Sequence, residues 1–232
     1  MNCLTIDCST HWLIAGMHRV EDGVITKGTE VNHLAAKESS SRLVSEIRQL
    51  IETFGATPDR IIVAKGPGSF TGVRIAVSTA RNLSQLWSIP VCGIDTLTLY
   101  GWSVKQHDSI TEPFALLIDG RQKRFYTKVI DNNIDNTYSN IIYDLDPGDF
   151  DIIDPNIRIC YTDNPAELVL PADRIKIEIK SIRTFNFTAG MFLETAIQLG
   201  CLHTNTSWQE LIPMYVRNNP AKPNRTGPEP SS

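Results

Sequence analysis

The sequence predicts an α/β protein made of two lobes built on one plan, and three observations support this prediction. Strand patterns at 4–7, 12–19 and 24–31 open the chain, with a turn at 21–23 between the second and third. Strands and amphipathic helices then alternate. Finally, Leu116-Leu117-Ile118-Asp119 repeats the pattern of Leu4-Thr5-Ile6-Asp7, which indicates that the plan starts again.

The first lobe is expected to follow the order β-β-β-α-β-α-β-α. A helix is predicted over 35–54, because its apolar residues share one arc of roughly 120° at 100° per residue. These residues are Leu43, Val44, Ile47, Leu50, Ile51 and Phe54, and the opposite side carries Arg42, Glu46, Gln49 and Glu52. A strand at 60–64, a helix at 71–87, a strand at 91–94 and a short helix through Tyr100 complete the lobe.

The second lobe is expected to be smaller than the first. Its strand patterns fall at 116–119, 124–130, 138–145, 157–161 and 175–179, and its one convincing helix at 188–199. We therefore predict an N-terminal lobe over 1–106 and a C-terminal lobe over 107–217. Residues 218–232 are rich in proline and lack apolar periodicity, which predicts a disordered tail.

Composition narrows the functional class. The net charge is −4 and no basic cluster follows a helix, so free-standing nucleic-acid binding is not indicated and any RNA contact would need a partner's charge. The five cysteines include no C-x-x-C pair, so we expect reduced, mostly buried thiols. The histidines lack metal-site spacing. With no signal sequence and no apolar run of ~18 residues, we expect a cytoplasmic protein.

A glycine-rich loop, 65–74, lies between a strand and a helix, where loops often bind anions. It is not a Walker A loop, because the glycine spacing is wrong and Val73 stands where the lysine would be. The loop is closer to a dinucleotide-binding turn, in which Asp95 would be the acid that binds the ribose, but its third glycine comes one place late. The remaining interpretation is a tight strand-to-helix turn with Ser69 or Thr71 as the N-cap.

Two further patterns have both a structural and a functional interpretation. Asp7 and Asp119 each end a buried strand, so they are solvent-facing carboxylates or the phosphate-orienting acids of a cleft; the sequence contains no Gly-Gly for an adenosine loop. In the helix over 71–87, Ile75 and Leu86 form a second stripe with Thr79 and Asn82 between them. This stripe predicts contact with the neighbouring helix over 35–54 or a partner surface made by both helices.

Several segments taken together resemble the TsaB (YeaZ) family from residue 2 to about residue 217. They are Ile6-Asp7-Cys8-Ser9-Thr10, the loop from Gly66 to Ile75, Ile118-Asp119-Gly120-Arg121 with Phe125-Tyr126, and Pro213-Met214-Tyr215-Val216-Arg217. The chain departs from the common family pattern at Gly120, often Ala, and at Ala76, often Gly. The resemblance implies the two-lobed actin, hexokinase and heat-shock ATPase fold, which is ribonuclease H-like, with a reduced second lobe.

The resemblance also implies a role without chemistry of its own in making threonylcarbamoyladenosine in tRNA. Such chains pair with the catalytic subunit TsaD, the ATPase TsaE joins them, and tRNA binds only within the complex. Related TsaD chains carry a metal-binding His-x-x-x-His where this chain has Thr96 and Tyr100, which cannot replace imidazole ligands. We accordingly expect no metal and no cofactor, and a homodimer when the partner is absent.

The expected site has two parts. A vestigial phosphate loop would comprise Asp7, Ser9, Gly66, Gly68, Ser69, Thr71, Gly72, Arg74 and Asp119. A partner-binding surface would comprise Arg42, Glu46, Gln49, Ile75, Thr79, Asn82 and Leu86. The alternative hypothesis is an active ATPase or small-molecule kinase of the same fold, with Asp7 and Asp119 holding metal and phosphate. A peptidase lacks support, because no nucleophile–base pair is evident.

Overall fold

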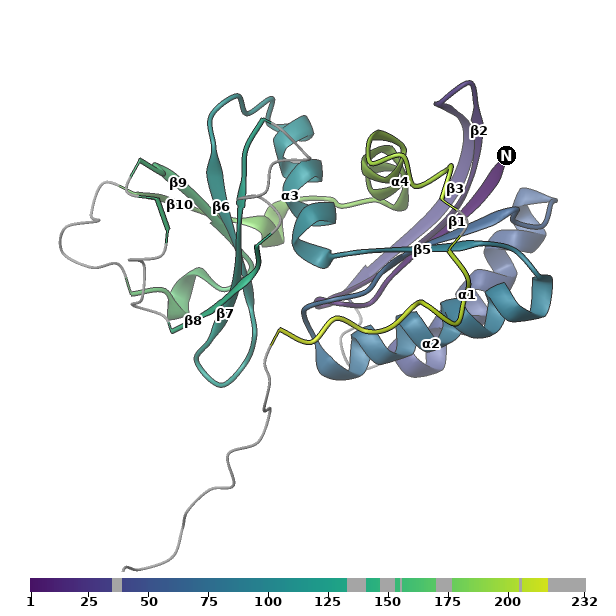
Figure 1. Cartoon of the computed structure of the whole chain (residues 1–232), viewed down its shortest axis with the longest axis horizontal. Coiled ribbons are helices and arrows are strands. Elements are labelled where there is room, and N and C mark those ends of the chain that lie inside the picture. The colour runs from purple at the N-terminus through teal and green to yellow at the C-terminus, as the bar shows by residue number, and fades with distance from the viewer. Residues whose placement is uncertain are drawn as a thin grey trace, which may run out of the picture.

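A computed structural model describes residues 1–34, 39–132, 141–146, 153–154, 156–169, 177–204 and 206–216, so the predicted tail lies outside the described residues. Two five-stranded sheets stand side by side (Figure 1). The first contains β1 (Asn2–Asp7), β2 (Trp12–Glu21), β3 (Val24–Leu34), β4 (Arg60–Ala64) and β5 (Val91–Ile94). The second contains β6 (Phe114–Asp119), β7 (Phe125–Ile130), β8 (Tyr143–Leu145), β9 (Ile159–Thr162) and β10 (Glu178–Ser181).

The two sheets have the same topology. The first runs β3-β2-β1-β4-β5 and the second β8-β7-β6-β9-β10, each with an antiparallel meander followed by two parallel strands. β6 therefore takes the place of β1, and Asp119 that of Asp7, as the last residue of the strand. The duplication predicted from the repeated Ile-Asp is confirmed at the level of topology.

Helices cover both faces of the first sheet. α1 (Ser39–Phe54) and α2 (Phe70–Trp87) pack together on one face (Figure 1), where they enclose a core with the inward side chains of β1, β2 and β4. α3 (Thr96–His107) and α4 (Ala189–Gln198) lie on the other side, within the core that both sheets share. Among the described residues, no helix is both long and apolar enough to cross a membrane.

α3 is longer than the short helix predicted through Tyr100. It continues to His107, and nearly every residue from Thr96 to Lys105 is buried. A helix that is buried on all sides shows no amphipathic stripe, so periodicity could not find its end. The expected α4 is confirmed; among the residues described after β6 it is the only α-helix.

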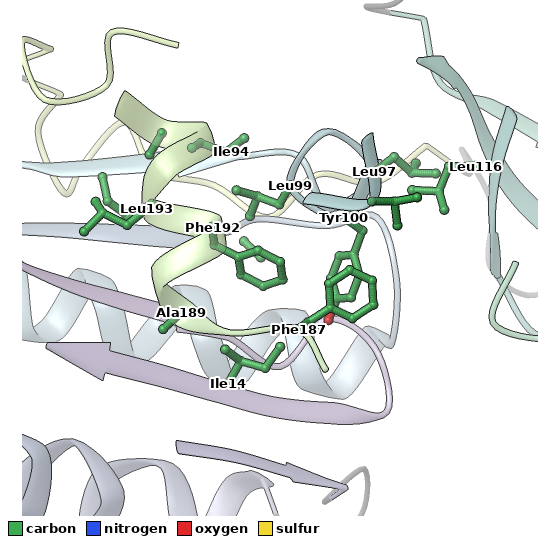
Figure 2. Close-up of a cluster of buried hydrophobic side chains, with 14 of the residues drawn as sticks. Ile14, Ile94, Leu97, Leu99, Tyr100, Leu116, Phe187, Ala189, Phe192 and Leu193 are labelled. Atoms are coloured by element: carbon green, nitrogen blue, oxygen red, sulfur yellow. The ribbon is translucent and has the colours of Figure 1, made fainter. Parts of the chain in front are cut away.

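The shared core joins the two halves of the chain. Tyr100 of α3 stacks edge-on against Phe187, with ring centroids 4.6 Å apart, and Phe192 of α4 lies 5.0 Å from the same ring (Figure 2). Ala189 begins α4 and faces Gly16 of β2, where a Cβ would come within 2.6 Å of the alanine Cβ. α4 thus follows the second sheet in sequence but packs on the first. The limits 1–106 and 107–217 remain predictions.

Candidate functional site

The glycine-rich loop joins β4 to α2 as a tight turn. Ser69 is the N-cap of α2, because its Oγ accepts a hydrogen bond from the Gly72 amide at 3.3 Å. Thr71, the other predicted cap, lies inside the first turn and is exposed. Gly66 has φ of 96°, in the left-handed region that favours glycine, and its carbonyl accepts from the Thr96 amide at 2.9 Å. The loop is therefore anchored to both neighbouring helices.

The other two glycines allow this loop to press against the loop that follows β1. A Cβ on Gly68 would lie 2.1 Å from the Ser9 carbonyl oxygen, and one on Gly72 would lie 1.8 Å from the Cys8 carbonyl oxygen. The Ser69 amide donates to the Ser9 carbonyl at 2.6 Å. A backbone donor that a phosphate could have used is thus bonded within the protein, so these glycines serve backbone packing.

Asp7 is fully buried and bonded internally. Its Oδ1 accepts from the Ser9 amide at 2.7 Å, and its Oδ2 accepts from the Tyr100 hydroxyl at 2.6 Å. Burial raises the pKa of Asp7, although the bonds from Ser9 and Tyr100 oppose the shift. The Tyr100 hydroxyl also lies 2.7 Å from Thr10 Oγ1. Both carboxylate oxygens therefore have protein partners, and Tyr100 covers the acid.

Asp119 ends the equivalent strand of the second sheet and is also held in place. Its Oδ1 accepts from the Arg121 amide at 2.7 Å, and its Oδ2 accepts from Asn164 Nδ2 at 3.3 Å. Its own amide donates to Asp163 Oδ1 at 2.8 Å. The two predicted aspartates thus occupy matching positions, but each is engaged by partners of its own.

Asp163 is a site residue that the sequence reasoning missed. It directly follows β9, the strand that matches β4, so the duplicated topology was the signal that could have found it. Burial raises the pKa of Asp163 to about 6. His11 Nδ1 lies 4.0 Å from its Oδ2, and burial lowers the pKa of His11 to about 4. At neutral pH the imidazole is therefore uncharged and does not compensate the buried carboxylate.

The Asp163→Asn variant is expected to be more stable than the natural protein at pH 7.5. Because the pKa of Asp163 rises from 3.8 in the unfolded chain to about 6 in the folded one, the folded state keeps this carboxyl protonated between pH 3.8 and about pH 6. Above that range the carboxyl is ionised in both states, and the charge opposes folding. An amide keeps the acceptor for Asp119 without the charge, and the expected gain is about 2 kcal/mol. Urea unfolding at pH 7.5, 5 and 4 should show this gain shrinking as the pH falls; a gain independent of pH would contradict the assignment.

A cleft of about 740 Å³ lies between the glycine loop and the β6–β7 turn. Of the predicted loop residues, Gly68 and Arg74 line it. The Arg74 guanidinium lies 3.7 Å from the centre of the Phe70 ring, and its Nε donates to the Tyr215 hydroxyl at 3.0 Å. Phe70, Tyr126 and Tyr215 were not predicted as site residues, since only the folded chain brings them together.

The predicted partner surface lies on α1 and α2. Leu86 is 73% exposed, Gln49 and Asn82 are exposed, and Ile75 and Thr79 are half-buried. Arg42 Nη2 lies 3.3 Å from Glu46 Oε1, which also lies 3.1 Å from His33 Nε2. Val44, predicted on the apolar arc of α1, is 63% exposed and adds to the apolar surface of these helices. α1 and α2 therefore present exposed apolar groups beside polar ones.

The five cysteines are buried thiols, as predicted. In the described part of the chain, no three His, Cys, Asp or Glu side chains gather in a way that could hold a metal ion. Thr96 and Tyr100 are both fully buried, and Tyr100 Oη is committed to Asp7 and Thr10.

Comparison with known proteins shows the relationship of this chain. The family model described as TsaD, tRNA N6-adenosine threonylcarbamoyltransferase, matches residues 26–145. The tRNA threonylcarbamoyladenosine biosynthesis protein TsaB of Bacillus subtilis (strain 168) is 32% identical over 130 residues, 55% of this chain and 54% of the relative. TsaB of Escherichia coli (strain K12) is 27% identical over 129 residues, 54% and 53% of the two chains. The match thus spans about half the length of these relatives.

Solved structures show the same fold. A Pseudomonas aeruginosa structure described as an uncharacterized protein with similarity to peptidase YEAZ has a TM-score of 0.75 and 18% identity, covering 93% of this chain and 99% of the other. A second structure, YeaZ from Pseudomonas aeruginosa, has a TM-score of 0.74 at the same identity and coverage. With the family match over residues 26–145, the chain belongs to the TsaD family, and these relatives confirm its resemblance to TsaB (YeaZ).

Proposed function

We propose that this protein is a subunit without catalytic activity of its own in the synthesis of threonylcarbamoyladenosine in tRNA. The observation that carries this proposal is the bonding of Asp7, whose oxygens accept from Ser9 and Tyr100 at 2.7 and 2.6 Å in a fully buried site. An acid that orients a metal-bound phosphate needs an oxygen open to solvent. The glycine loop adds support, since its Ser69 amide donates to Ser9 and its glycines pack on backbone.

The proposed action of the chain is to bind and stabilise a catalytic TsaD-like subunit, which a TsaE-like ATPase joins. We assign the docking to the α1–α2 surface, defined by Arg42, Glu46, Gln49, Ile75, Thr79, Asn82 and Leu86. The exposed Leu86 supplies apolar area, and the polar side chains of this surface supply a rim. Without its partner, an exposed apolar stripe of this kind would be covered by a second copy of the chain.

Reconstitution tests the proposal directly. The chain would be co-expressed with the TsaD-like and TsaE-like proteins of the same organism, and the complex isolated by size exclusion. Threonylcarbamoylation of tRNA would then be measured with and without this chain. We expect stable co-elution and a strong loss of modification when the chain is left out. Full modification without it would contradict the proposal.

A second measurement separates the scaffold from an active ATPase or kinase of the same fold. The purified chain alone would be tested for binding and hydrolysis of Mg-ATP, with the three proteins together as the positive control. We expect no hydrolysis above background. Turnover at ~1 per second, a rate typical of enzymes, would overturn the proposal in favour of the enzyme.

A further inference from the structure

We propose that the cleft between the glycine loop and the β6–β7 turn receives one unstacked nucleotide of the tRNA held by the assembled complex. The identity of the RNA rests on the proposed function, whereas the chemistry of the cleft rests on its own residues. The cleft is about 740 Å³ in volume, and its walls come from Phe70, Tyr126, Tyr215 and the arginines Arg74 and Arg121.

The aromatic side chains offer stacking surfaces for a base. Phe70 is 49% exposed and Tyr215 is 51% exposed, with ring centroids 6.0 Å apart. Arg74 lies against the Phe70 ring and donates to the Tyr215 hydroxyl, which holds the two rings at one wall of the cleft. Exposed rings that are fixed in this way suit the flat apolar face of a nucleobase, which stacks with little regard to sequence.

The rim of the cleft is positive although the whole chain carries a net charge of −4. Two cations line the cleft, Arg121, which is 71% exposed, and Arg74, which is also exposed. The exposed Lys123 directly follows the lining residue Gln122. The acids nearby are withdrawn from solvent: the Asp119 side chain is 10% exposed and Asp163 is 5% exposed. Arg121 Nη1 lies 3.5 Å from Asp119 Oδ2, and its mostly exposed guanidinium still faces solvent. An anionic phosphate would therefore meet cations at the mouth of the cleft.

The β6–β7 turn holds Arg121 and Lys123 in an uncommon backbone conformation. Arg121, Gln122 and Lys123 have φ of 62°, 56° and 58°, the left-handed region that non-glycine residues rarely adopt. The bond from the Arg121 amide to Asp119 Oδ1 at 2.7 Å and the bond from the Gly120 amide to the Arg124 carbonyl at 2.8 Å fix the turn. Strain retained at a cleft points to a binding role for the side chains that it presents.

The cleft suits a nucleotide within RNA better than free Mg-ATP. Both oxygens of Asp7 accept hydrogen bonds from within the protein, and the Ser69 amide is already bonded to the Ser9 carbonyl, so neither is open to the metal or phosphates of Mg-ATP. The remaining groups can hold one base and one or two phosphates, which gives weak binding alone. A tRNA already bound by the partner would raise the local concentration of that nucleotide.

The test uses the assembled complex and an anticodon stem-loop RNA. Ultraviolet crosslinking followed by mass spectrometry should link RNA to peptides containing Phe70 or Tyr215. Fluorescence anisotropy should show Tyr215→Ala and Arg121→Glu each weakening RNA binding at least fivefold, with the salt slope for Arg121→Glu reduced by about 1. Arg158→Glu, an exposed arginine just before β9, is the matched control and should change binding by less than twofold.

The outcomes separate this inference from the proposed function. The cleft proposal is overturned, and the scaffold role stands, if the complex modifies tRNA but neither peptide crosslinks to RNA. The same holds if Arg121→Glu weakens RNA binding no more than Arg158→Glu does. If the complex does not form, the chain alone is tested with an eight-nucleotide RNA in 50 mM salt. Binding that Tyr215→Ala removes would then support the cleft, and absence of binding would overturn it. If Mg-ATP displaces the RNA and binds more tightly than the RNA does, the cleft is a site for free nucleotide and the cleft proposal is overturned.

Discussion

The Leu86→Arg variant is expected to lose co-purification with the TsaD-like subunit. Leu86 is 73% exposed, so its side chain contributes little to the protein's own core. An arginine at a docking surface would put a charge into the interface. That charge would lose its hydration there without gaining an ion-pair partner. Such a change weakens association by about 3 kcal/mol, or more than 100-fold. Co-elution and isothermal titration with the partner would measure the loss, and the variant's melting temperature should stay within about 2 °C of the natural value.

Val169→Arg provides the matched control for that experiment. Val169 is also an exposed apolar residue, at 63%, but it lies in the second half of the chain, away from α1 and α2. It should leave co-purification unchanged. The same α1–α2 surface is proposed to form the homodimer, so Leu86→Arg should also turn the isolated chain into a monomer on size exclusion. Normal complex formation by Leu86→Arg would show that the docking surface lies elsewhere.

The Gly72→Ala variant is expected to have the largest effect on stability. A Cβ at this position would lie 1.8 Å from the Cys8 carbonyl oxygen, a backbone atom that cannot rotate away. Relief requires moving α2 away from the loop after β1, which would strain the Ser69–Ser9 bond as well. We expect a loss of about 3 kcal/mol in the free energy of unfolding, measured with urea.

Gly190→Ala is the control, because it makes the same chemical change in the first turn of another helix. There the new Cβ would meet its nearest atom, His18 Nε2, at 3.4 Å, an ordinary contact distance. Alanine also favours the helix, so stability should be unchanged or rise by up to about 1 kcal/mol. Equal stabilities for the two variants would mean that the glycine loop does not rest on the Cys8–Ser9 backbone.

The elements with a clear period were predictable from sequence, and the contacts that define the site were not. The three opening strands, α1, α2 and α4 follow alternation or helical spacing, and the repeated Ile-Asp predicted the shared topology. The end of α3 was missed because burial on all sides removes the amphipathic signal. Tyr100 reaches Asp7 across 93 positions of sequence, and Phe70 meets Tyr215 only after the chain returns to the glycine loop. No local pattern encodes such pairings.

The return of the chain to the first sheet has a consequence for how the molecule folds. The Thr206 carbonyl accepts from the Val91 amide at the outer edge of β5, the Met214 amide donates to Lys65, and α4 covers β1 to β3. All five strands of the first sheet lie before residue 95, but this face and edge of the sheet stay uncovered until residues 189–214 have left the ribosome. The two halves must mature together, as one cooperative unit dominated by distant contacts, which makes folding slow. A nascent chain that stops after α3 would expose the apolar face of β1 to β3, and would need a chaperone to keep it from aggregating.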